Sequence, residues 1–119
     1  MKLLIVENSL SVRQILKSVV APFADEIEEC GDGDDAVLLY EHGHPDFVLM
    51  DIDLKEMDGI SATRKIMTED PNAKIIIVTN YDETDLRDEA GKAGACGYIL
   101  KENLMDLRLF FQNKKYLEI

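Results

Sequence analysis

The chain has 119 residues, enough for one domain with a substantial hydrophobic core. Hydrophobic residues make up 46% and charged residues 31%, as in soluble globular proteins, so a disordered chain is not expected. The 24 acidic residues against 13 Lys and Arg give a net charge of −11, which disfavours direct binding to nucleic acid. The apolar run after Lys2 is too short for a signal peptide or a membrane span. Cys30 and Cys96 lack metal-binding spacing, which predicts reduced thiols in a cytoplasmic protein.

The first predicted strand, residues 2–6, is continuously apolar and ends at Glu7 and Asn8. Ser9 or Asn8 can cap the helix that follows. Pro22 limits that helix to about residue 21. Its expected apolar face has helical spacing and consists of Val12, Ile15, Leu16, Val19, Val20 and Phe23.

Residues 25–30 predict a weaker strand suited to a sheet edge, and residues 34–42 a short helix stopped by glycine and proline. Residues 47–50 are four apolar residues in a row, which is typical of a strand buried on both faces. A helix over residues 59–67 follows, with an inward face expected at Ile60, Thr63, Ile66 and Met67.

Residues 74–78 are β-branched and apolar, and they predict a fourth strand. Residues 83–93 predict a polar helix with a thin apolar stripe, weakened by Gly91. Residues 96–100 predict a fifth strand ending at Lys101, and Asn103 is expected to cap a last helix. That helix is expected to bury Leu104, Leu107, Phe110 and Phe111.

Strand and helix therefore alternate five times, which predicts an α/β fold: a parallel sheet with helices on both faces and right-handed crossovers. The carboxyl ends of parallel strands share one edge of the sheet, where such folds build their sites. Polar residues from across the chain should gather at that edge, namely Glu7, Asn8, Asp51, Thr79 and Lys101.

This group of residues suits phosphoryl chemistry. Buried acids around Asp51 require a cation, and Mg²⁺ is the divalent ion that combines few carboxylates with water and phosphate oxygens. The Asp51 carboxylate can attack a phosphoryl group. Lys101 and Thr79 can stabilise the other phosphoryl oxygens through an ammonium and a hydroxyl.

Simpler interpretations exist for each residue. Asp51 and Asp53 can be loop acids that cap the next helix. Thr79 can be a β-branched residue that merely finishes a strand. Lys101 can be a solvated charge at a helix start, although a cation is slightly unfavourable there.

The chain resembles a response-regulator receiver domain of two-component signalling over essentially its full length. The resemblance rests on the Glu7-Asn8 pair, Asp51 within LMDIDLKEMDG, Thr79 within IIIVTN, and GACGYILK ending at Lys101. It implies a single receiver domain over residues 1–119, with a three-layer, flavodoxin-like, doubly wound five-stranded sheet in the order 2-1-3-4-5. The GYILKE ending is similar to receivers that precede helix-turn-helix output domains, so a stand-alone regulator and an excised receiver both remain open.

The resemblance also implies roles for individual residues. Asp51 would be the phosphoacceptor, with Thr79 and Lys101 binding the phosphoryl group, and Thr79 and Tyr98 would form a switch pair. The Mg²⁺ site would comprise Glu7 as an outer ligand, Asp51, the backbone carbonyl of Asp53 and the position of Asn8. The implied partners are a histidine kinase or phosphotransfer protein, and a downstream protein or output domain. The second would bind the face of the fourth helix, fifth strand and fifth helix.

Asn8 departs from the family pattern, because a second acid that binds the metal directly usually stands there. Asn80, Lys55 and Glu102 also depart from the residues that are frequent at their positions. A receiver-like binding module that works without phosphorylation is therefore a second hypothesis for the function. A phosphatase of the haloacid dehalogenase type is a third hypothesis, but that family needs further acids after its lysine. The preferred hypothesis is a phosphoryl-accepting signalling domain and not a turnover enzyme.

Overall fold

The computed structural model describes residues 1–113. Its five strands are β1 (Lys2–Val6), β2 (Glu26–Cys30), β3 (Phe47–Met50), β4 (Ile75–Thr79) and β5 (Gly97–Leu100). They form one sheet in the order β2-β1-β3-β4-β5, and every neighbouring pair is parallel. The predicted fold class and strand order are confirmed. No helix among residues 1–113 is long and apolar enough to cross a membrane.

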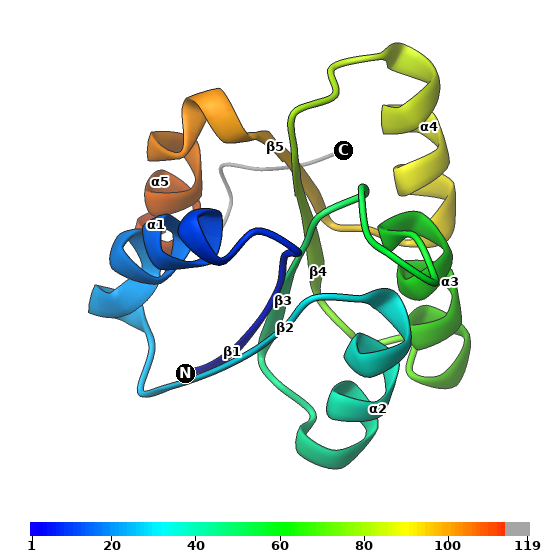
Figure 1. The fold of residues 1–119 in the computed structure, drawn as a ribbon, viewed down its shortest axis with the longest axis horizontal. Helices are drawn as coiled ribbons and strands as arrows, with labels where there is room; N and C mark the ends of the chain where they lie inside the picture. Colours follow the sequence, from blue (N-terminus) through cyan, green and yellow to red (C-terminus); the bar gives the residue numbers. More distant parts are fainter. Residues whose placement is uncertain (114–119) are drawn as a thin grey trace.

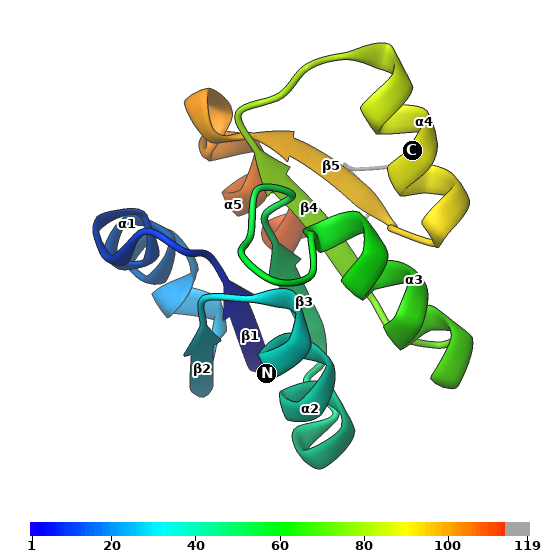
Figure 2. The same cartoon turned by 45° about the vertical axis from the view of Figure 1, so that its right-hand side comes forward.

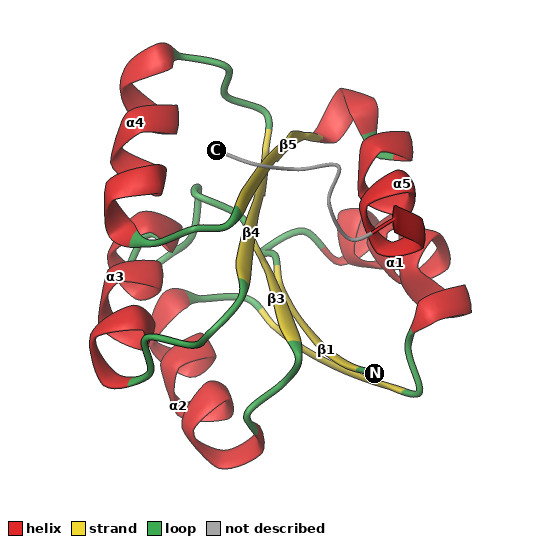
Figure 3. Cartoon of the chain, turned by 180° about the vertical axis from the view of Figure 1, so that it is seen from behind, coloured by secondary structure: helices red, strands yellow, loops and turns green. Residues whose placement is uncertain are grey.

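Five helices alternate with the strands: α1 (Leu10–Val20), α2 (Gly33–Gly43), α3 (Gly59–Glu69), α4 (Thr84–Ala93) and α5 (Met105–Asn113). Helices α1 and α5 cover one face of the sheet, and α2, α3 and α4 cover the other (Figures 1 and 3). The crossover connections of parallel strands require this three-layer arrangement.

Two hydrophobic clusters fill the space on either side of the sheet. Along β1, Leu3 and Ile5 belong to the cluster under α1 and α5, whereas Leu4 and Val6 belong to the cluster under the other helices. Successive side chains of a strand point to opposite faces, so a strand covered on both faces must be apolar throughout. This explains the unbroken apolar runs of β1, β3 and β4, whereas the edge strand β2 buries only Cys30 fully.

The first helix differs from its prediction at one position. Ser9 caps α1, because its hydroxyl accepts a hydrogen bond from the amide of Val12 at 3.4 Å. The helix ends at Val20, and a 3₁₀ turn containing Pro22 follows. The inward placement of Ile15 was wrong: its side chain is 51% exposed, at a groove between α1 and α5. The side of α1 that faces the sheet and α5 carries Leu16 and Val20, and Ile15 lies outside that buried face.

The start of the last helix was also predicted wrongly. Residues 101–103 form a 3₁₀ turn, so Asn103 ends that turn and the residue before α5 is Leu104. The side chain of Leu104 packs against the cluster beneath α1 and α5. Leu104 is partly buried there, so this position contributes apolar contact next to the start of α5.

Helix α4 is weakly anchored, as its sequence indicates. Only Ala90 and Ala93 are buried, and Leu86 is packed partly against the core. No side chain caps its first turn, and it ends at Gly94 with a φ of 107°. Small buried side chains give little apolar surface to hold the helix, so α4 can shift at low cost.

Candidate functional site

The strand register brings four polar side chains to one edge of the sheet. Val6 pairs with Met50 and Met50 with Ile77, so Glu7 and Asp51 leave adjacent strands at the same level. The amide of Asp51 donates a hydrogen bond to the carbonyl of Val6 at 3.0 Å, which fixes this level. Thr79 pairs with Leu100, so Lys101 emerges one residue beyond Thr79 at the same edge.

Lys101 joins the two acids. Its Nζ lies 2.7 Å from Glu7 Oε1 and 2.9 Å from Asp51 Oδ2. Glu7 is 2% exposed and Asp51 is 4% exposed, so both carboxylates are buried. Buried charges are costly unless they are paired, and here one ammonium compensates two carboxylates. The lysine is therefore not a solvated charge at a helix start.

The pKa values agree with an excess of negative charge in this cluster. Burial raises the pKa of Asp51, the charge of Glu7 raises it further, and Lys101 only partly opposes the rise. Burial alone would lower the pKa of Lys101, but its contacts with the Glu7 and Asp51 carboxylates outweigh this and the pKa lies above its ordinary value. The cluster as built carries one negative charge more than positive, so it favours an additional cation.

Three buried oxygen atoms of the site lack a hydrogen-bond partner within residues 1–113: Glu7 Oε1, Asp51 Oδ1 and Thr79 Oγ1. The Lys101 ammonium, 2.7 Å from Glu7 Oε1, compensates the charge of that atom. A buried polar atom without a partner costs about 1–3 kcal/mol. The hydroxyl of Thr79, which is fully buried, and the free oxygen of Asp51 are both available to a ligand.

The loop between β1 and α1 is held by hydrogen bonds around Glu7. The amide of Ser9 donates to Glu7 Oε2 at 2.9 Å. Arg13 Nε donates to the carbonyl of Glu7 at 2.6 Å, and its guanidinium also lies 3.6 Å from Glu29. Sequence reasoning missed Arg13; its only signal is one basic residue in the first turn of a mainly apolar helix.

Asp58 and Gly59 shape the loop that follows Asp51 and leads into α3. Asp58 caps α3 by accepting hydrogen bonds from Ile60 and Ser61 amides, both at 2.9 Å. Asp51 and Asp53 are therefore not the capping acids of this helix. At Gly59 an added Cβ would lie 1.8 Å from the carbonyl oxygen of Asp51, so only glycine allows this close approach. Sequence reasoning missed this role of Gly59.

Tyr98 links β5 to the loop after β4. Its hydroxyl donates to the carbonyl of Tyr81 at 2.7 Å, and burial raises its pKa. The guanidinium of Arg87, from α4, lies 4.5 Å from the centre of its ring, a distance typical of a cation–π contact. Tyr98 pairs with Ile77, two residues before Thr79, so the two expected switch residues lie on adjacent strands.

The oxygen donors at this edge fit Mg²⁺. Across the described part of the chain, no three His, Cys, Asp or Glu side chains group as a metal site. Glu7 and Asp51 are the two buried acids, whereas the side chains of Asn8 and Asp53 are exposed. Mg²⁺ needs few carboxylates and retains several waters, and the carbonyl of Asp53 and the amide of Asn8 are further oxygen donors. The unpartnered oxygen of Asp51 is the observation that favours this fit.

Comparisons with known proteins agree on the family. Residues 3–109 match the family described as response regulator receiver domain. The chemotaxis protein CheY of Thermotoga maritima is 40% identical over 101 residues, covering 84% of each chain. A DNA-binding response regulator of the LuxR family from Staphylococcus aureus superposes with a TM-score of 0.84 at 27% identity, covering 97% of this chain and 98% of that chain.

One similar structure is a complex with BeF₃ and Mg²⁺. It is the CheX–CheY–BeF₃–Mg²⁺ complex of Borrelia burgdorferi, with a TM-score of 0.81 and 26% identity, covering 92% of this chain and 87% of that chain. Receiver domains are signalling domains and in general not turnover enzymes. With its fold, its site and these relatives in agreement, the chain belongs to the receiver domains of two-component response regulators.

Proposed function

We propose that Asp51 accepts a phosphoryl group from a histidine kinase or phosphotransfer protein in the cytoplasm, and that Mg²⁺ is required. The observation that supports this most is the buried contact of Lys101 with both Glu7 and Asp51. A lysine held between two acids, beside an unpartnered Asp51 oxygen, is placed to receive the charge of an incoming phosphoryl group.

The protein's own contribution to the reaction comes from the groups at this edge. An oxygen of the Asp51 carboxylate attacks phosphorus, and the phosphorus–nitrogen bond of the donor phosphohistidine breaks, returning its electron pair to the imidazole. Lys101 and the Thr79 hydroxyl then bind two of the phosphoryl oxygens. Glu7, Asp51, the Asp53 carbonyl and the Asn8 position would hold Mg²⁺, and the ion would supply positive charge that offsets the charge of the phosphoryl oxygens.

Phosphorylation is proposed to change the face formed by α4, β5 and α5. Thr79 would turn its free hydroxyl toward the phosphoryl group, and Tyr98 and the weakly anchored α4 would rearrange with it. The difference in phosphoryl affinity between the two arrangements sets the limit on the energy available. A downstream protein or output domain would bind this face. Amide hydrogen exchange with a beryllium fluoride mimic tests it, and protection changes confined to α1 and α2 would refute it.

Asn8 supports a second candidate, a receiver-like module that binds partners without phosphorylation. An amide at this position offers a dipole where a carboxylate would offer a full charge, and the Asn8 side chain is exposed. Weaker Mg²⁺ binding would slow phosphorylation.

Incubation with acetyl phosphate, with and without Mg²⁺, separates the candidates by mass measurement. We expect one phosphoryl group per chain, dependent on Mg²⁺ and lost in Asp51→Asn. Asp53→Asn is the matched control, because it keeps the backbone carbonyl and its side chain is exposed. No uptake by the parent protein would support the binding module. Continuous release of phosphate over many turnovers would indicate a phosphatase.

A further inference from the structure

The net charge of the chain is confined to one part of it. Residues 18–54 contain eleven acidic residues and no lysine or arginine, and the rest of the chain has 13 acids against 13 bases. The whole formal charge of −11 therefore belongs to the segment that forms the end of α1, β2, α2, β3 and their connections. A one-sided field of this kind attracts and orients a positively charged partner.

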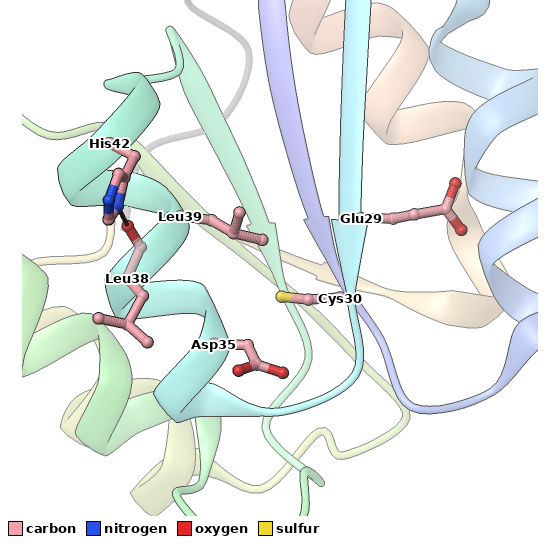
Figure 4. A pocket seen from close by; sticks show the side chains of 6 residues that line it. All are labelled: Glu29, Cys30, Asp35, Leu38, Leu39 and His42. Carbon is pink, nitrogen blue, oxygen red and sulfur yellow. Dashed lines mark hydrogen bonds between the residues drawn. The ribbon is translucent and has the colours of Figure 1, made fainter.

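A groove lies within this acidic part, between β2 and α2. It has a volume of about 560 Å³ and is lined by Glu29, Cys30, Asp35, Leu38, Leu39 and His42. Figure 4 shows Cys30 and Leu39 facing each other across it, with Asp35 at one end. Burial raises the pKa of Cys30 to about 12, so the thiol stays neutral and forms part of an apolar floor. Leu38 on α2 is 53% exposed, which leaves apolar surface for a ligand.

The strand that borders the groove has a free edge. β2 is the first strand in the order of the sheet and pairs only with β1, and Figure 2 shows it at the margin of the molecule. Backbone groups on such an edge can pair with an added strand. Glu26 and Glu28 on β2 share one cation, the ammonium of Lys2 at 3.4 and 2.9 Å, so this group keeps one net negative charge. That charge would repel a second copy of the same strand but attract a basic one.

Several acids around the groove lack a cation. Within residues 1–113, Asp32, Asp34, Asp35 and Glu41 form no ion pair, and the charge of Asp32 raises the pKa of Asp35. Glu29 already contacts Lys17 and Arg13, and its side chain points to the other side of β2 (Figure 4). The unpaired acids lie along α2 and at its start, and Asp35 is the one of them that lines the groove.

We propose that an extended, lysine- or arginine-rich segment of a partner protein adds as a sixth strand along the free edge of β2. One of its apolar side chains enters the groove against Leu38 and Leu39, and a basic side chain lies beside Asp35. Like charge disfavours a second copy of this chain, and the same charge excludes nucleic acid and anionic membranes. This surface is separate from the α4–β5–α5 face, and its test does not depend on phosphorylation.

The test uses the unphosphorylated chain and a short labelled peptide of alternating lysine and valine. Fluorescence anisotropy gives its dissociation constant, and amide chemical shifts give its location. We expect saturable binding that weakens with salt and shifts the amides of residues 26–42. Two control peptides carry glutamate in place of lysine, or N-methyl groups on alternate amides that block strand pairing. Neither should bind.

Protein variants locate the contact. Leu38→Ser should weaken binding about tenfold, and since Leu38 is exposed the fold is retained. Asp35→Asn should weaken binding less and reduce its salt dependence. Met105→Ser is the matched control, an exposed apolar residue on α5, and should change nothing.

Any of four results would overturn the proposal. They are the absence of saturable binding, equal binding of either control peptide, an equal loss in Met105→Ser, and a dimer of the protein that Leu38→Ser dissociates. The last result would assign the groove to a second copy of the chain.

Discussion

Removing the ammonium of Lys101 should destabilise the fold strongly, because the lysine compensates two buried carboxylates. In Lys101→Met, Glu7 and Asp51 keep their burial but lose their cation at 2.7 and 2.9 Å. Removing one partner of a buried ion pair costs about 3–5 kcal/mol. Asp51→Asn should lower stability far less, because the remaining ion pair of Glu7 and Lys101 has no net charge.

The assay is urea unfolding at pH 7 in the presence of chelator, for the parent, both single variants and the double variant. We expect Lys101→Met to lower the free energy of unfolding by about 3 kcal/mol. The double variant, Lys101→Met with Asp51→Asn, should regain part of this stability, because it buries one uncompensated carboxylate instead of two. Addition of Mg²⁺ should also restore stability to Lys101→Met, because the ion binds only the folded site. A loss within about 0.5 kcal/mol, the range of ordinary surface substitutions, would refute the role assigned to Lys101.

The cost of Lys101→Met should also depend on pH. The pKa of Asp51 lies above its ordinary value in the folded chain, and loss of the lysine removes the group that opposes this rise. A carboxyl whose pKa is raised by folding binds more protons in the folded state, so stability falls as pH rises. The loss of unfolding free energy in Lys101→Met, relative to the parent, should therefore be larger at pH 7 than at pH 5.

Three further substitutions test other parts of the account. Asn8→Asp should tighten Mg²⁺ about tenfold and destabilise the metal-free fold, because it adds a carboxylate near an acidic cluster; unchanged affinity on titration would place Asn8 outside the site. Gly59→Ala should prevent normal folding or displace Asp51, because its Cβ would lie 1.8 Å from the Asp51 carbonyl oxygen, and a parent-like thermal melt would contradict this. Tyr40→Phe removes the hydrogen bond to Asp70 that lowers the pKa of that carboxyl. A carboxyl whose pKa is lower in the folded than in the unfolded chain stabilises the fold at pH values above its unfolded-state pKa of about 4. This stabilisation is lost as pH falls, so the stabilities of the parent and of Tyr40→Phe should converge in acid.

The sheet and its polar edge could be predicted because their signals are local. Apolar runs covered on both faces cannot tolerate polar residues, so Glu7 and Asp51 mark where β1 and β3 leave the core. A parallel sheet then places these ends together without further information. The prediction that Asp51, Thr79 and Lys101 emerge at one edge follows from chain order alone.

Features set by lateral packing could not be predicted. The exposure of Ile15 depends on where α5 lies against α1, and so does the packing of Leu104, just before α5, against the cluster beneath these helices. The close approach of Gly59 to Asp51 requires the path of the whole loop. The groove beside Leu38 lies between α2 and the edge strand β2, so it likewise depends on how the helix packs against the sheet.

The location of the acyl phosphate tests the central claim most directly. The chain is treated with acetyl phosphate and Mg²⁺, the product is reduced with borohydride, and the modified residue is identified by peptide mass spectrometry. We predict that the modified residue is Asp51 alone and that omission of Mg²⁺ removes the signal. Modification at Asp53, at Asp58 or at any residue outside the site, with Asp51 unmodified, would contradict the account.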